Sequence, residues 1–162
     1  MKTLNDLFLH FLKDVYYAER QIMKALPKMA KLASDDQLRQ GLLQHREETQ
    51  HQIERLQKVF DLVGKRAQGI TCEAINGLIE EAEELIEEGE KGPVMDAGLI
   101  ACAQAVEHYE MARYGALIAW AKLLGNREAV TQLQETLDEE KKADALLNQI
   151  ASKSVNQQAK AA

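Results

Sequence analysis

The chain has 162 residues, enough for one domain with a hydrophobic core. Hydrophobic residues make up 46% and aromatic residues only 5%, with nine glycines and two prolines, which favours helices over a sandwich or barrel. The net charge of -6 and the lack of a basic patch argue against nucleic-acid binding, and no run approaches the roughly 20 apolar residues of a membrane span.

The first predicted helix runs from Leu4 to Ala33, where apolar residues recur at steps of four and three. One position of that stripe is occupied by Glu19 instead of an apolar residue. The amphipathic pattern begins at once, without the apolar segment of a signal peptide, and Cys72 and Cys102 are isolated thiols. We therefore expect a cytoplasmic protein.

The second predicted helix covers about Gln37 to Val63, after a break at residues 34–36. Its apolar stripe turns polar between Leu42 and Ile53, at His45, Glu48, Thr49 and Gln52. A loop follows, and a shorter acidic helix is expected from Cys72 to Glu88 with Thr71 as its N-cap.

Two more long helices are predicted, from about Val94 to Leu124 and from Arg127 to about Ser152. Glu110 interrupts the apolar seam of the first, and Glu140 and Asp144 interrupt that of the second. Tight turns join the long helices in two antiparallel pairs, which predicts an all-α four-helix bundle with an additional short helix in the long connection. We expect the bundle to span residues 1–153 and residues 154–162 to form a frayed tail.

The acids in the seams predict a metal centre. Burying an ionised carboxylate without a partner is very costly, and six of them require positive charge nearby. Arg113, three residues from Glu110, could pair with that one acid, so a multivalent cation is the simplest partner for the rest. The predicted ligands are Glu19, His45, Glu48, Glu107, Glu110, Glu140 and Asp144.

Five runs of residues carry a resemblance to a known family. The run Glu107-His108-Tyr109-Glu110 looks like the third-helix motif of rubrerythrin-type proteins. Over nearly the whole chain the sequence resembles the YciF/YciE family of ferritin-like bacterial stress proteins, through Asp14–Glu19, His45–Thr49, Gln52–Leu56, Val106–Glu110 and Thr136–Lys141. This resemblance implies a ferritin-like bundle, a homodimer and a link to stress responses.

One position departs from the wider ferritin pattern, in which two helices carry Glu-x-x-His. Ala143 stands where the fourth-helix histidine is expected, and Asp144 could serve instead. On the second helix His45 lies closer to the apolar stripe than His51, so His45 is the preferred nitrogen ligand and His51 the alternative. A centre rich in carboxylates suits two ions of iron or manganese better than zinc.

Two functions from different classes remain open at this point. A dimetal oxidoreductase of the ferroxidase or peroxidase type would use dioxygen or peroxide as its small-molecule substrate. The alternative is a ferritin-like bundle without catalysis that acts as a binding or assembly module. Iron storage in a multi-subunit cage is a third candidate function.

Overall fold

The computed structural model describes all residues from Met1 to Ala162, and every regular element in it is a helix. In chain order the elements are α1 Leu4–Leu32, α2 Asp36–Leu62, α3 Glu73–Glu88, α4 Pro93–Leu123, α5 Arg127–Ile150, a π-helical turn η1 Ala151–Val155 and α6 Asn156–Ala161.

Short-range sequence signals set most of the helix ends. Thr3 and Asp6 form a reciprocal capping box at the start of α1, and the side chains of Asp35 and Asn126 cap α2 and α5. After α4 the chain reverses at Gly125, whose φ of 75° lies in the left-handed region that glycine adopts without a Cβ penalty.

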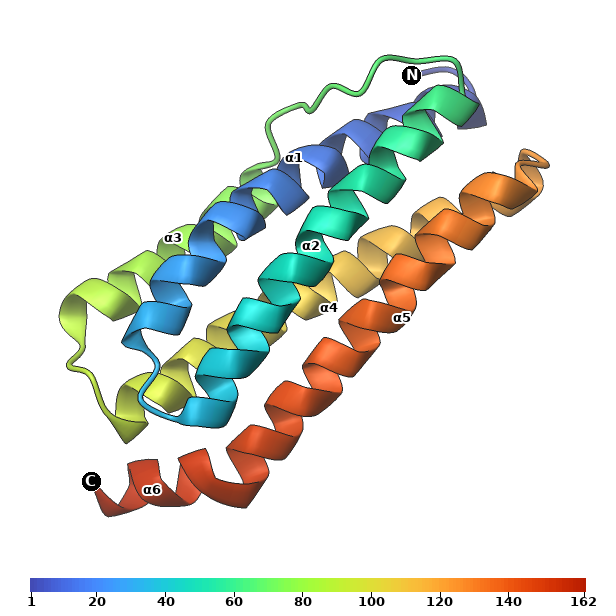
Figure 1. Cartoon of the computed structure of the whole chain (residues 1–162). Helices are drawn as coiled ribbons and strands as arrows, with labels where there is room; N and C mark the ends of the chain where they lie inside the picture. The colour runs from blue at the N-terminus through green and yellow to red at the C-terminus, as the bar shows by residue number, and fades with distance from the viewer.

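The four long helices form one bundle in which every neighbouring pair is antiparallel (Figure 1). The hairpins α1–α2 and α4–α5 lie side by side, with α2 against α5 and α1 against α4. Because α2 ends at the opposite end of the bundle from the start of α4, the connection must run back along the whole length. It does so as a loop followed by α3, which packs on α1 and α4. The predicted four-helix bundle with an extra short helix is confirmed.

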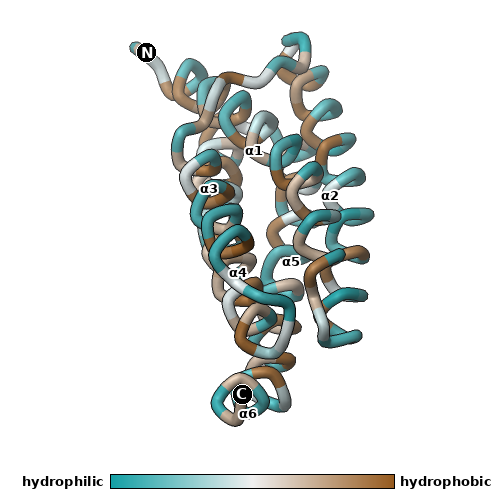
Figure 2. Tube along the Cα trace, turned by 90° about the vertical axis from the view of Figure 1, so that its left-hand side faces the viewer, coloured by the Kyte–Doolittle hydropathy of each residue, from teal (hydrophilic) through white to brown (hydrophobic).

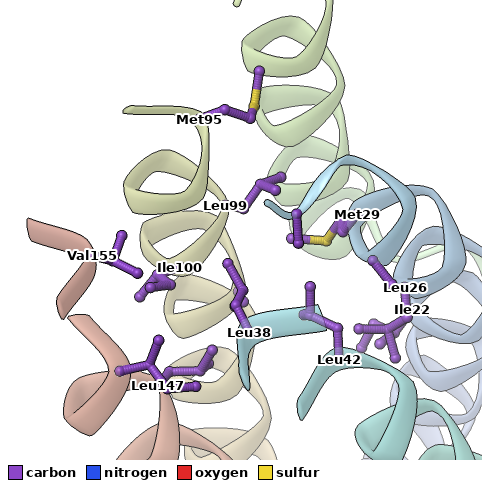
Figure 3. Packing of buried hydrophobic residues seen from close by; sticks show 14 of the residues in the cluster. Ile22, Leu26, Met29, Leu38, Leu42, Met95, Leu99, Ile100, Leu147 and Val155 are labelled. Atoms are coloured by element: carbon purple, nitrogen blue, oxygen red, sulfur yellow. The ribbon is translucent and has the colours of Figure 1, made fainter. Parts of the chain in front are cut away.

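A band of polar residues divides the hydrophobic core into two clusters. One cluster of 17 buried residues fills the end of the bundle near the α1–α2 turn; Figure 3 shows part of it, including Leu26, Leu42, Leu99 and Leu147. The other, of 15 buried residues, fills the opposite end around Phe60. Between them lie the buried polar side chains of Glu19, His45, Thr49, Gln52, Glu107, Glu110 and Glu140.

The outer faces of the helices are hydrophilic, as α2 shows in Figure 2, where polar residues line its outward side. No helix is long and apolar enough to cross a membrane. Beyond residue 153, where we expected a frayed tail, the structure describes η1 and α6, and Val155 is fully buried in the first core cluster.

Candidate metal centre

Four buried side chains converge at mid-bundle. His45 from α2, Glu107 and Glu110 from α4, and Glu140 from α5 each offer a ligand atom, and these atoms all lie within 4.8 Å of one another. Glu107 and Glu110 share a face because they are three residues apart on one helix. The group therefore joins the two hairpins, which places their acids at a common depth.

The imidazole of His45 lies between acids on both sides. Its Nε2 is 3.3 Å from Oε1 of Glu107 and 3.7 Å from Oε2 of Glu140. Its Nδ1 faces outward and is 3.7 Å from Oε2 of Glu48, whose side chain is 30% exposed. Burial by itself lowers the pKa of His45, but the carboxylates of Glu48, Glu140 and Glu19 raise it above its ordinary value overall.

Glu19 brings the fourth helix, α1, to the centre. It is fully buried, and its Oε1 accepts a hydrogen bond from the hydroxyl of Tyr114 on α4. Burial and the nearby Glu140 carboxylate raise its pKa to about 8. A carboxyl group from each of α1, α4 and α5 thus lies beside the imidazole from α2.

Like charges and burial act together on the remaining acids. Burial raises the pKa of Glu107 to about 7. Burial and neighbouring carboxylates raise the pKa of Glu110 and of Glu140 well above the ordinary range. Without added positive charge, the centre therefore retains protons that exposed glutamates lose.

The same side chains have unused ligand atoms. Seven carboxylate or imidazole atoms of five residues are buried without a hydrogen-bond partner in the protein: Glu19 Oε2, both ring nitrogens of His45, Glu107 Oε2, both carboxylate oxygens of Glu110, and Glu140 Oε2. Buried polar atoms are nearly always satisfied, so this concentration requires an explanation. An oxygen-rich set with one imidazole nitrogen fits a divalent cation that prefers hard ligands.

Arg113 does not neutralise this centre. Its guanidinium lies over the rings of Phe11 and Tyr109, at 4.8 and 5.1 Å from their centroids, and its Nε is 3.8 Å from Oδ2 of Asp14. The expected pairing with Glu110 is therefore replaced by one with Asp14, because the side chain turns toward α1. The case for a cation at the centre is correspondingly stronger.

Beyond Glu19 and the four converging side chains, three further residues considered from the sequence lie outside the centre. Glu48 sits at the rim beside His45. Asp144, one turn beyond Glu140, accepts hydrogen bonds from Gln104 at 2.9 Å and lies 3.3 Å from His108. His51 points to solvent and contacts Glu54, whereas His45 is in the core.

Several supporting residues were not singled out from the sequence. Gln52 is fully buried and donates to both Glu140 and Glu139. Arg55 holds Glu139 with two hydrogen bonds of 2.6 and 2.7 Å. This chain of contacts fixes Glu140 from the α2 side. A signal existed, since Gln52 falls in the polar interruption of the α2 stripe, but an uncharged amide does not by itself indicate a ligand.

Comparison with known proteins extends the similarity over nearly the entire chain. The family described as a domain of unknown function (DUF892) matches residues 3–160. The protein YciF of Escherichia coli K12 is 48% identical over 160 residues, which cover 98% of this chain and 96% of YciF.

Solved structures agree with this similarity. The crystal structure of the E. coli stress protein YciF superposes with a TM-score of 0.92 at 48% identity, covering 96% of this chain and 99% of that one. YcfI from Rhodopseudomonas palustris gives a TM-score of 0.88 at 55% identity, covering 91% and 94% of the two chains. The chain belongs to the DUF892 family and is a relative of the stress protein YciF.

Proposed function

We propose that this protein binds two ions of iron or manganese in the bundle core and uses them to oxidise ferrous iron or reduce peroxide. The observation that carries the proposal is the group of buried carboxylate and imidazole atoms that have no partner in the protein, contributed by all four long helices. Carboxylate-rich ligand sets favour iron and manganese over zinc.

The residues divide into two roles in this proposal. Glu19, His45, Glu107, Glu110 and Glu140 would hold the metal, because their free atoms face the interior. Iron or manganese ions held by these residues would supply the redox chemistry for reducing dioxygen or peroxide. Glu48 would orient His45 through Nδ1 and leave Nε2 for the metal, as outer carboxylates do for ligating histidines. Asp144 lies one helical turn from Glu140 and would be available as a further carboxylate ligand.

The acids also provide a place for protons. In the metal-free centre burial raises the pKa of Glu107 to about 7, so this carboxyl exchanges a proton near neutral pH. Because Glu107 would bind the metal as a carboxylate, metal binding would release that proton.

A non-catalytic scaffold is the second candidate function. Ala143 leaves the α5 helix without the histidine of the wider ferritin pattern, and YcfI is described as a candidate structural protein. In a scaffold of this kind the buried acids would remain protonated and no metal would be required.

Metal analysis distinguishes these two functions. We expect protein purified without chelators to carry about two ions of iron or manganese per chain. The Glu110→Gln variant should lose them, whereas Glu47→Gln, which changes an exposed glutamate of α2, should keep them. Wild-type protein that takes up neither metal, even when ferrous iron is added without oxygen, would establish the scaffold instead.

We further propose that the protein acts in stress responses as a homodimer. The similarity to the stress protein YciF supports the first part, and the resemblance to the YciF/YciE family supports the second. Mass measurement in solution tests the dimer and also separates it from a multi-subunit storage cage.

A further inference from the structure

A small cavity beneath α3 is lined both by exposed residues and by two residues of the candidate metal centre. Its volume is about 30 Å³, and it lies between α1, α3 and α4. Eleven of the fifteen lining residues are hydrophobic, and they include the small side chains of Ala82 on α3 and Ala103 on α4. The remaining four lining residues are charged or titratable, and their exposure distinguishes an outer end of the cavity from an inner end.

These four residues form one solvent-exposed pair and one buried pair. Lys28 and Glu83 are joined by a contact of 2.7 Å and are 66% and 48% exposed, so they mark the outer end. His45 and Glu107 are buried residues of the metal centre and mark the inner end. Every other residue that lines the cavity is hydrophobic.

Size and polarity limit what can occupy this space. One water-sized molecule needs about 10–15 Å³ of such volume, so the cavity holds a molecule of two or three heavy atoms at most. A polar molecule entering it would lose its hydrogen bonds with water and find no replacements on the walls, and an ion would lose far more. An uncharged apolar diatomic molecule has no such cost.

We propose that this cavity is the entry route for dioxygen and selects it over hydrogen peroxide as the oxidant. The proposal rests on the proposed function and specifies the substrate of that same centre. In the step considered, two ferrous ions lose one electron each, and dioxygen takes up two electrons and two protons and leaves as hydrogen peroxide. Hydrogen peroxide as oxidant takes two electrons and two protons to give two waters, and it is disfavoured in this cavity because it would lose its hydrogen bonds with water there.

Xenon tests the cavity without any metal, because xenon occupies apolar cavities of this kind. Crystals of metal-free protein under xenon pressure should show xenon between Ala82 and Ala103. Ala103→Val, which adds two methyl groups to the wall, should abolish it. Ala121→Val makes the same substitution at a buried position of the same helix that does not line the cavity, and it should leave xenon in place. An empty wild-type cavity would overturn the proposal.

Stopped-flow oxidation of bound ferrous iron tests selectivity. Ala103→Val should slow oxidation by dioxygen about tenfold and leave oxidation by hydrogen peroxide unchanged, while Ala121→Val should alter neither rate. Ala82→Val blocks the cavity from the α3 side and serves where Ala103→Val does not fold. Equal slowing with both oxidants, or none with either, would contradict the route in a protein that still binds and oxidises iron. Failure of the proposed function looks different, because wild-type protein would then oxidise iron with neither oxidant.

Discussion

Tyr114 donates a hydrogen bond to Glu19, and both side chains are fully buried. The Tyr114→Phe change keeps the ring and removes this donor, so a buried carboxyl oxygen loses its partner. We expect the free energy of unfolding to fall by about 1–3 kcal/mol, measured by urea denaturation of metal-free protein.

Tyr17 provides a matched control for this change. Its hydroxyl donates to Asn76 at 3.0 Å in a half-buried setting, where water can replace the bond. Tyr17→Phe should therefore cost less than Tyr114→Phe, by about 1 kcal/mol. Equal costs would show that the hydrogen bond to Glu19 contributes no more than a partly solvated one.

Glu48 is the residue whose role depends most on the structure. It lies 3.7 Å from Nδ1 of His45 and outside the converging group, so it orients a ligand in the proposed centre. Loss of such outer partners typically weakens metal binding about 10–100-fold. We expect this loss for Glu48→Gln by calorimetric titration, with no change for the exposed neighbour in Glu47→Gln. Complete loss of binding, as expected for Glu110→Gln, would instead make Glu48 a direct ligand.

At the scale of elements, the loop before α3 is held against α1. The amide of Ile70 donates to the carbonyl of Lys13 at 3.3 Å, and Gly69 lies directly over Tyr17. A Cβ at Gly69 would be 3.0 Å from Cβ and 3.2 Å from Cα of Tyr17, and backbone cannot move aside cheaply. This close approach is one reason why the connection lies along the bundle.

Two glycine substitutions test that contact. Gly69→Ala should lower the free energy of unfolding by about 1–3 kcal/mol, because α1 and the loop must separate. Gly77→Ala, inside α3 where an added Cβ meets nothing within 4 Å, should raise it by about 0.5–1 kcal/mol, because alanine favours helix. Thermal unfolding followed by circular dichroism measures both. A stabilising Gly69→Ala would mean that the loop does not pack tightly on Tyr17.

The helices could be predicted closely because their signals are local. Periodicity placed α1 to α5 to within a few residues, although η1 and α6 lie where a frayed tail was expected. The break at residues 34–36 matches the start of α2, where Asp35 is the N-cap. The N-cap of α3 shows where local sequence signals do not predict a helix end. Thr71 was the expected cap, but Cys72 occupies that position without a side-chain bond to the helix, and its thiol lies 3.0 Å from the hydroxyl of Tyr109 on α4. The position of the α3 N-cap thus depends on a contact with Tyr109, which is 37 residues away in the sequence.

For the whole molecule, the sequence indicated that acids interrupt all four seams but not how the two hairpins align. A tight turn fixes the register of the two helices within each hairpin, so the sequence constrains which acids can face each other there. Whether Glu19 and Glu140 lie at the same level depends on how the two hairpins pack together. No short-range pattern in the sequence indicates this packing. The same reason explains why Gln52 and Tyr114 were not assigned, and why Arg113, which could have paired with Glu110, lies beside Asp14 instead.

The polar band between two hydrophobic clusters makes the whole bundle sensitive to pH. Burial raises the pKa of Glu19 from 4.5 to about 8 and that of Glu107 to about 7, so the folded protein binds these protons more tightly than the unfolded chain. The stability they contribute is complete below about pH 4.5 and is lost as the pH rises toward 8. Metal-free protein should therefore unfold more easily at pH 8 than at pH 5, by a few kcal/mol in urea.

Metal reverses this trend, because its ligands must be deprotonated and their repulsion is then offset by the bound charge. The difference in unfolding free energy between metal-loaded and metal-free protein should grow from pH 5 to pH 8. Glu110→Gln removes one acid of the band, so the metal-free variant should show a flatter pH dependence than wild type. A dependence unchanged by Glu110→Gln would place its origin in surface charge. A flatter pH dependence would assign its origin to the polar band that separates the two halves of the core. The free-energy cost of burying acids without metal is concentrated in this band.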